Sequence, residues 1–356
     1  LDGEQVDQIV EFEAQQQVPY PINEVAWGYQ LMGDPDDIEV EVVLAAIKAE
    51  ELTEIDEIVS GSGLKSLGAE VAPIALYNAL RFNYSDTEGV GVLVDIGART
   101  TDIIFMEDNK MFIRTVKIGG ADISRSISKE FGVDYAAADY RKIADGFVAL
   151  GGAYADHDDP EIAAISKVVR NSLTRLHSEI MRTVNFYRSQ QGGSAPTFVL
   201  LSGATSGLPF IREFFAEKLS LPVDYFNAFR NVTVAGSVDQ DSVAQNAHTM
   251  GELVGSAINQ TGGAPVEIEL IPESVKASKD LDKRKPSLVL ALIAVVALLG
   301  ALGFYFSNGA GIAAERAESI SVKADNLKKF NGEIEGLKEE IEIIDGKKMP
   351  FVESIR

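Results

Sequence analysis

The 356-residue sequence contains no cysteine and only three histidines. Without cysteine there is no disulfide framework, no thiolate zinc site and no cysteine nucleophile. The histidines, His157, His177 and His248, are far apart and lack metal-ligand spacing, which argues against a histidine-rich metal enzyme. Basic residues are also scarce, since 32 Lys and Arg stand against 54 Asp and Glu and the formal net charge is −22. Proteins that grip nucleic acid normally carry excess positive charge, so nucleic acid is not an expected partner.

The sequence has no initial Met and no signal peptide, and Leu1 already lies in sequence typical of a domain interior. We therefore expect a natural N-terminal segment before Leu1, and further sequence after Arg356. The length suffices for two or three domains with a large core.

Residues 287–306 form an apolar stretch without a charged residue. About 20 apolar residues are needed for a helix that crosses a hydrocarbon core of roughly 30 Å. A buried core helix of this length would normally have a polar face. Four basic residues precede the stretch, namely Lys279, Lys283, Arg284 and Lys285. The positive-inside rule then predicts one transmembrane helix, with residues 1–286 in the cytoplasm and 307–356 outside.

Beyond this stretch, apolar residues recur in a heptad pattern. The a positions are Ile320, Leu327, Ile334 and Ile341, and the apolar d positions are Phe330, Leu337 and Ile344. Lys323 occupies a further d position, and Gly332 and Gly336 weaken the pattern. The spacing favours a dimerising coiled coil over residues 307–356, although one amphipathic helix packed on a neighbour also fits.

The first 260 residues alternate strand and helix patterns, which predicts an α/β fold. Expected strands cover residues 92–96, 101–106, 111–118 and 198–201. Expected helices cover residues 122–131, 135–145 and 208–219, with a final helix inside 234–258. A long helix is indicated by an apolar stripe at spacings of three and four: Ile162, Ile165, Val169, Leu173, Leu176, Ile180 and Val184.

A glycine-bearing turn follows the buried strand that ends near Ile96. Gly97 lets the backbone approach a phosphate closely, and main-chain amides with the Thr100 and Thr101 hydroxyls can bind its oxygens. Asp95 could hold a hydrated Mg²⁺, which prefers one or two carboxylates plus phosphate and water. A tight hairpin turn without ligand explains the same residues.

A second glycine, Gly203, stands between a strand and a helix, where a ligand's ring or phosphate can approach a helix N-terminus. An ordinary strand-to-helix connection that binds no ligand would also explain Gly203. Glu179 and Arg182, three residues apart on the long helix, share a face. They could bind a ribose and stack on a base, or form a solvated ion pair.

The order of these elements identifies a family. DIGARTTDIIF, KIGGADISRSISKEF, SEIMRTVNFYRSQ and VLLSGATSGLPFIREFF resemble, in sequence, the actin-like ATPase superfamily and within it the PilM family of type IV pilus assembly, itself similar to FtsA. The likeness covers roughly residues 1–258, and the opening segment resembles the small inserted subdomain of PilM. It implies an actin-like fold of duplicated ribonuclease-H-like lobes that binds ATP and Mg²⁺, with weak or no hydrolysis.

The resemblance assigns roles residue by residue. Asp95, Gly97, Ala98, Thr100 and Thr101 match the second phosphate motif, and Asp95 is the implied Mg²⁺ residue. Glu179 and Arg182 match the ribose and base contacts, and Gly203 and Ala204 match the adenosine motif. Two departures weaken the match. Ala204 replaces the usual second glycine, and Ala72 precedes Pro73 where relatives often have Glu, with Glu70 two places earlier. The first phosphate motif, normally N-terminal, is absent from the sequence.

Residues 261–286 resemble the cytoplasmic start of PilN, because Ile268, Leu270, Ile271 and Pro272 lie in an INLLP-like motif. In that family the peptide docks into a groove of PilM and precedes a transmembrane helix and a periplasmic coil. Alternation of apolar and acidic residues suits an extended peptide that fills pockets on one face. A plain juxtamembrane linker is the alternative.

The sequence thus resembles a PilM–PilN fusion with the plan of the type II secretion protein GspL. The expected function is an inner-membrane scaffold of the type IV pilus platform that binds ATP and oligomerises with PilN- or PilO-like proteins, beside a motor ATPase. The alternative is a nucleotide-silent, GspL-like scaffold that recruits such an ATPase.

Overall fold

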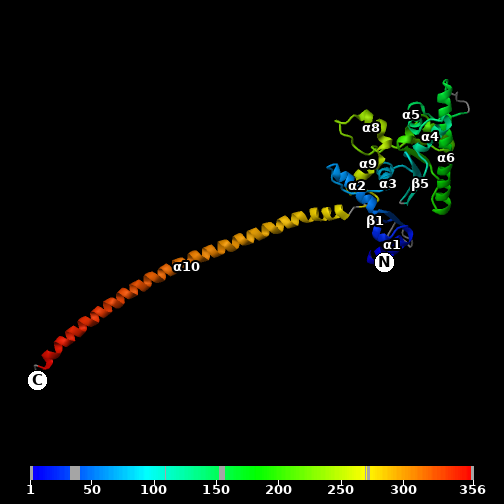
Figure 1. Ribbon diagram of the computed structural model, residues 1–356. Coiled ribbons are helices and arrows are strands. Elements are labelled where there is room, and N and C mark those ends of the chain that lie inside the picture. Colours follow the sequence, from blue (N-terminus) through cyan, green and yellow to red (C-terminus); the bar gives the residue numbers. More distant parts are fainter. Residues whose placement is uncertain are drawn as a thin grey trace. The chain divides into compact units, whose positions relative to one another are not determined.

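The computed structural model describes residues 3–32, 41–108, 110–151, 157–268, 270 and 273–353. The chain divides into two units, Leu1–Val275 and Lys276–Arg356. The strands and helices α1–α9 belong to the first unit, and most of helix α10 forms the second (Figure 1).

A five-stranded mixed sheet forms the centre of the first unit, in the order β5-β4-β3-β6-β7. Its strands are β3 (Gly91–Ile96), β4 (Thr101–Glu107), β5 (Lys110–Val116), β6 (Phe198–Ser202) and β7 (Val223–Tyr225). β4 is antiparallel to β3 and β5, whereas β3, β6 and β7 run parallel. This order is that of one ribonuclease-H-like lobe, and it confirms the predicted α/β class.

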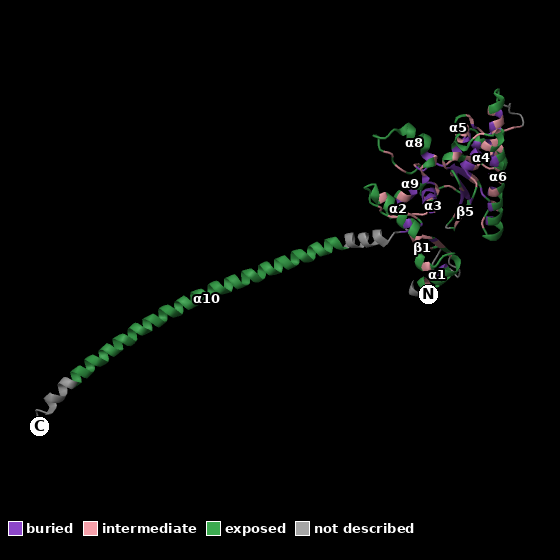
Figure 2. Cartoon of the chain, in the orientation of Figure 1, coloured by how far each residue is buried: buried purple, intermediate pink, exposed green. Residues whose placement is uncertain are grey.

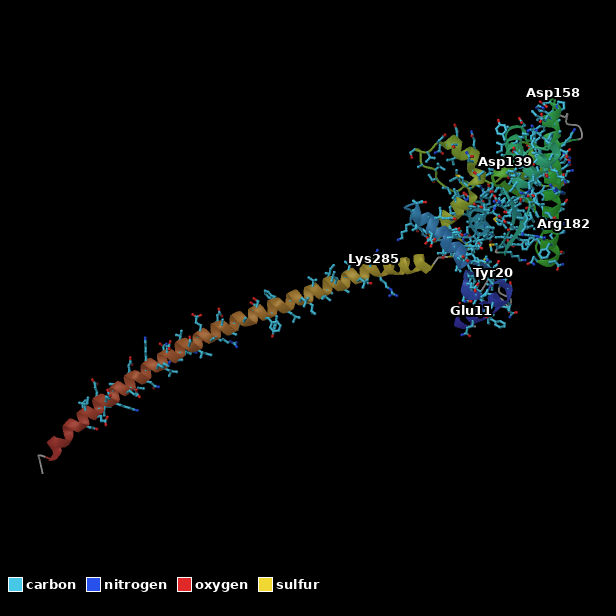
Figure 3. The ribbon with its side chains drawn as sticks, in the orientation of Figure 1. Glu11, Tyr20, Asp139, Asp158, Arg182 and Lys285 are labelled. Atoms are coloured by element: carbon cyan, nitrogen blue, oxygen red, sulfur yellow. The ribbon has the colours of Figure 1, made fainter. Side chains whose placement is uncertain are left out.

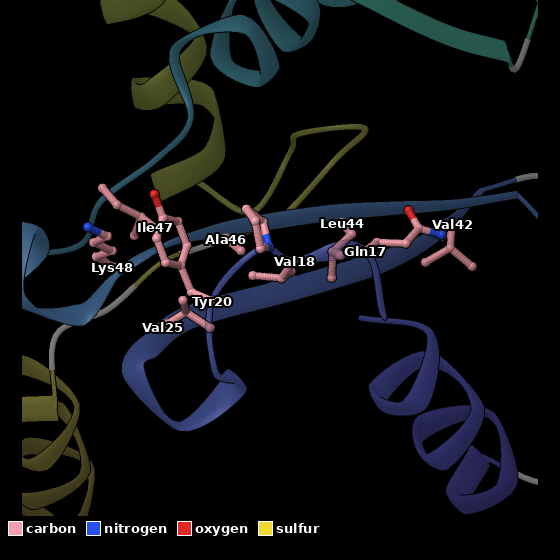
Figure 4. A pocket seen from close by; sticks show the side chains of 10 residues that line it. Gln17, Val18, Tyr20, Val25, Val42, Leu44, Ala46, Ile47 and Lys48 are labelled. Carbon is pink, nitrogen blue, oxygen red and sulfur yellow. The ribbon is translucent and has the colours of Figure 1, made fainter. Parts of the chain in front are cut away.

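Only one lobe of the expected duplicated pair is present among the residues described. The other sheet there is a two-stranded antiparallel hairpin of β1 (Val25–Met32) and β2 (Glu41–Lys48). Its outer face borders a pocket of about 540 Å³ (Figure 4), lined in part by Lys48 and Tyr20, whose ammonium and ring centre are 4.5 Å apart. Its inner face packs on the lobe, where Ala45 is buried.

Helices cover both faces of the five-stranded sheet. One face carries α4 (Gly120–Phe131), α5 (Tyr135–Asp145), α6 (Pro160–Gln190) and α7 (Ile211–Leu219). The other carries α3 (Ala72–Tyr84) and α9 (Gly251–Gln260). In β3, Val92 and Val94 belong to the first cluster and Leu93 to the second, because successive side chains point to opposite faces. Burial on both faces explains the continuous apolar run.

The predicted helices are largely confirmed. α5 has the predicted bounds, and α4 begins two residues earlier than predicted. The Asp159 carboxylate caps α6 by accepting from the Glu161 and Ile162 amides, and five of the seven stripe residues are buried. Those five are Ile165, Val169, Leu173, Leu176 and Ile180. The other two are partly buried.

Three local features differ from the sequence expectation. The helix expected from Leu208 begins at Ile211, because Ala204–Gly207 form a 3₁₀ turn and Phe210 takes a positive φ of 64°. The expected final helix divides into α8 (Gln240–Asn246) and α9 around a 3₁₀ turn. The elements without a sequence expectation are β7, the hairpin, α1 (Gly3–Gln17) and α2 (Ala49–Gly61).

Helix α10 (Glu273–Glu353) contains both the apolar stretch and the heptad segment. Within the described chain it is the one helix long and apolar enough to cross a membrane, by length and composition. Its side chains from Arg284 to Asp345 are exposed (Figure 2), including the a and d residues of the heptads.

Candidate functional site

The two glycine motifs of the sequence meet at one edge of the sheet. β3 and β6 are parallel neighbours with Asp95 opposite Ser202, so the segments that follow them emerge side by side. Gly203 has a φ of +83°, and a Cβ there would lie 2.6 Å from the Ile96 carbonyl oxygen. Glycine is therefore required at this position by both conformation and space.

The turn after β3 is fixed to the N-terminus of α4. The Gly120 amide donates to the Gly97 carbonyl at 2.9 Å, and the Ala121 amide donates to the Ala98 carbonyl at 2.7 Å. The Thr205 hydroxyl also donates to the Gly97 carbonyl, at 3.1 Å. Ala98 is exposed, and its amide donates to no protein acceptor among the described residues. A free amide at a rigid turn beside a helix N-terminus suits an anion.

Carboxyl groups crowd the same edge. Asp95 faces Asp102 across the β3–β4 pair, and both are buried. The pKa of Asp95 is raised to about 6, mainly by burial; the Ser202 hydroxyl acts to lower this pKa, and Glu252 and Asp102 act to raise it. Burial also raises the pKa values of Asp102 and Glu252. No cluster of three His, Asp or Glu side chains with metal-binding geometry occurs among the described residues. One or two carboxylates are what hydrated Mg²⁺ needs beside phosphate.

The two threonines of the turn differ. Thr101 is fully buried, and its hydroxyl donates to the Ile118 carbonyl at 2.8 Å. Thr100 is only partly buried, and its hydroxyl has no partner within the described chain. Thr100 is therefore the better placed of the two to meet a ligand.

A pocket of about 410 Å³ joins the turn after β3 to the loop after β6, because Ala98 and Ala204 both line it. α5 closes the third side with Tyr135, Asp139 and Lys142. The Lys142 ammonium donates to Asp139 at 2.7 Å and to the Ser124 hydroxyl at 2.9 Å. The sequence does not predict a role for Asp139 or Lys142, because their spacing of three on a helix does not distinguish them from Glu179 and Arg182.

The structure does not bring Glu179 and Arg182 into this pocket. They form an ion pair of 2.5 Å on α6, and the Arg182 side chain is 69% exposed. Neither residue lines the pocket that contains Ala98 and Ala204, and Asp139 on α5 and Arg182 on α6 stand apart in Figure 3.

The segment after α9 occupies a groove of the first unit. Val266, Ile268 and Leu270 are at most 5% exposed and belong to the cluster of α3 and α9. Leu270 forms an antiparallel bridge with Ala69, with reciprocal hydrogen bonds of 2.8 and 3.0 Å. This burial agrees with the expected period of two. Ile271 and Pro272, the other two residues of the motif, lie outside the described residues.

The sheet order and its glycine-lined edge define an actin-like α/β protein of the ribonuclease-H class. A family model described as type IV pilus assembly protein PilM matches residues 1–260. The chain therefore belongs to the PilM family, which gives it a role in type IV pilus assembly.

Three solved structures have matches to this chain, and the first of them supports the fold. A structure described as a PilM-PilN type IV pilus biogenesis complex matches with a TM-score of 0.62 and 22% identity, over 74% of each chain. EutJ, an ethanolamine utilization protein of Carboxydothermus hydrogenoformans, matches with a TM-score of 0.38 and 17% identity, over 65% of this chain and 86% of its own. MreB5 of Spiroplasma citri, bound to AMPPNP, has a TM-score of 0.38 and 16% identity, over 59% and 64% of the two chains.

Proposed function

We propose that the protein is an inner-membrane scaffold of the type IV pilus platform, in which a PilM-like domain binds a PilN-like segment of its own chain. The observation that carries this proposal is the burial of Val266, Ile268 and Leu270 in the groove, with Leu270 three residues before the start of α10. The related structure is described as a PilM-PilN type IV pilus biogenesis complex. Here covalent linkage would raise the local concentration of the segment to about millimolar, so that even a weak contact stays closed.

Leu270→Asp tests the docking. An unpaired carboxylate in an apolar groove is costly, so the segment should detach. Full burial of Leu270 contributes roughly 1.5–3 kcal/mol. Hydrogen exchange of the detergent-solubilised chain should then accelerate across residues 266–270, while β3 stays protected. Leu253→Asp, at an α9 leucine that is 69% exposed, is the matched control. Unchanged exchange in Leu270→Asp would show that the segment is only a linker.

The pocket at the sheet edge is proposed to bind ATP with Mg²⁺. The turn of Gly97, Ala98 and Thr100 would hold phosphate oxygens through main-chain amides and a hydroxyl. Asp95 would orient the hydrated metal, whose positive charge would offset the crowding of the carboxylates. Thr101 would support the turn from within, since its hydroxyl is already bonded.

On the opposite side of the pocket, Asp139 and Lys142 would contact the nucleoside, in place of Glu179 and Arg182. They line the pocket with Ala204, and Gly203 sets the path of the loop. Lys142→Met should therefore weaken ATP binding, whereas Arg182→Met, which opens an exposed ion pair, should not. If Arg182→Met weakened ATP binding and Lys142→Met did not, the nucleoside would instead be contacted by Glu179 and Arg182 on α6.

The membrane role rests on residues 287–306, which we propose to span the inner membrane once, with 1–286 cytoplasmic and 307–356 periplasmic. The exposed heptad face of α10 would pair with a second helix of the platform, from a PilN- or PilO-like protein or a second copy. The motor ATPase of the machine would be a further partner.

A nucleotide-silent, GspL-like scaffold is the second candidate. Ala204 favours it, because a methyl group lines the pocket where relatives have glycine, and so does Ala72 before Pro73. An intact protein that binds no ATP would establish this alternative.

A further inference from the structure

The groove holds the main chain of the docked segment as well as its side chains. The Asn78 side chain, 1% exposed on α3, donates to the Val266 carbonyl at 2.8 Å and accepts from the Val266 amide at 3.0 Å. On the other edge of the same segment, the Gln30 side chain of β1 donates to the Pro265 carbonyl at 2.9 Å and accepts from the Glu267 amide at 2.6 Å.

Four consecutive main-chain groups are thus bound by two amide side chains from different parts of the unit. In an extended chain the main-chain polar groups of successive residues point to opposite edges. Asn78 binds the main-chain groups of Val266 on one edge of the segment, and Gln30 binds those of Pro265 and Glu267 on the other edge. The segment therefore lies between the hairpin and α3, with two hydrogen bonds to each.

The hairpin depends on such contacts. An isolated two-stranded sheet is marginally stable in water, so β1 and β2 need packing on a further surface. Ala26, Val43 and Ile47 of the hairpin pack on the same cluster that contains Val266, Ile268 and Leu270. Removing the segment would open part of this surface to water.

We propose that the docked segment holds the β1–β2 hairpin against the lobe, with Gln30 and Asn78 as the residues that position the segment. This inference rests on the docking proposed above and adds a coupling: occupation of the groove stabilises the hairpin, and the hairpin retains the segment. The side-chain amides of Gln30 and Asn78 bind only main-chain groups. The groove would therefore accept any extended segment with apolar residues at alternate positions.

Gln30→Met tests one direction of the coupling, because it keeps side-chain length and removes both bonds. Exchange at the Glu267 and Leu270 amides of the full chain in detergent should accelerate about tenfold or more, as for a segment that opens more readily. Tyr29→Phe is the matched control. Tyr29 is next to Gln30 on β1, and the substitution removes the bond from the Tyr29 hydroxyl to Asp7 of α1, so it should leave residues 265–270 unchanged.

Leu270→Asp tests the other direction. It should accelerate exchange across Val25–Met32 and Glu41–Lys48 while β3 stays protected. Release of residues 266–270 with full protection of the hairpin would refute the coupling between segment and hairpin, but not the docking of the segment. Normal exchange of the segment in Gln30→Met would also refute the coupling. Failure of Leu270→Asp to release the segment would refute the docking itself.

Discussion

Replacing Asp95 by Asn should make the ligand-free protein more stable and the nucleotide site weaker. The Asp95 side chain is 9% exposed, and its pKa of about 6 reflects burial together with Glu252 and Asp102. In an unfolded chain the same carboxyl titrates at about 3.9. This difference corresponds to roughly 3 kcal/mol that the folded state loses when Asp95 ionises. Asn keeps the size of the side chain and cannot ionise.

The raised pKa of Asp95 determines how the free energy of unfolding changes with pH. Because the folded protein holds the proton more tightly than the unfolded chain, the cost is absent below about pH 3.9. It grows as the pH rises, and is fully present above the folded pKa of about 6. Asp95→Asn should therefore raise the free energy of unfolding at pH 7.5 by up to about 3 kcal/mol, with the gain shrinking toward pH 4.

Hydrogen exchange of the β3 and β6 amides measures this stability without interference from α10, after correction for the intrinsic rate at each pH. Asp122→Asn is the control of opposite sign. Burial would raise the pKa of Asp122, but the Arg125 guanidinium and the Gly119 amide hold it below its usual value overall. Its loss should destabilise the protein at pH 7.5, and less as the pH falls. A destabilised Asp95→Asn at pH 7.5 would refute the reasoning and make Asp95 a structural acceptor.

Three further predictions follow from geometry. Gly203→Ala should lower thermal stability more than Gly132→Ala. Gly132 is in the left-handed region, where alanine costs about 1–2 kcal/mol. Gly203, at φ 83° and ψ 154°, has a conformation essentially restricted to glycine and would also press a Cβ against the Ile96 carbonyl; equal losses would contradict this. A cysteine at Asn308 should react with an impermeant thiol reagent on intact spheroplasts and one at Ser278 should not, the native chain being cysteine-free; the reverse labelling would refute the orientation. A cysteine at the a position Ile334 should form disulfide-linked dimers on oxidation if copies pair in parallel, and one at the outer position Glu339 should not; equal cross-linking at both would argue against a coiled coil.

The sheet edge could be predicted from sequence because its signals are local. A glycine directly after a mostly apolar strand is recognisable in both motifs, and parallel strands place such glycines together. Val266, Ile268 and Leu270 likewise show their alternation in sequence. These features follow from short-range backbone geometry, which a one-dimensional pattern records.

The other site residues could not be predicted from the sequence, because their roles depend on tertiary packing. Asp139 with Lys142 and Glu179 with Arg182 are both polar pairs three apart on helices, so spacing alone favours neither. Only the packing of α5 against α4 turns the first pair toward the pocket. Gln30 and Asn78 are ordinary amides in sequence, and their role depends on a segment more than 180 residues further along the chain. β7, with three residues, is too short for a periodic signal.

Calorimetric titration of Mg-ATP into the intact wild-type protein tests the central claim most directly. We predict saturable binding that Asp95→Ala abolishes or weakens strongly, and that Thr100→Ala weakens by about 0.5–1.5 kcal/mol, the net value of one hydrogen bond. Lys142→Met should weaken it and Arg182→Met should leave it unchanged. Absence of binding by the wild-type protein, or binding that none of the Asp95, Thr100 and Lys142 substitutions alters, would contradict the assignment of ATP to this edge of the sheet.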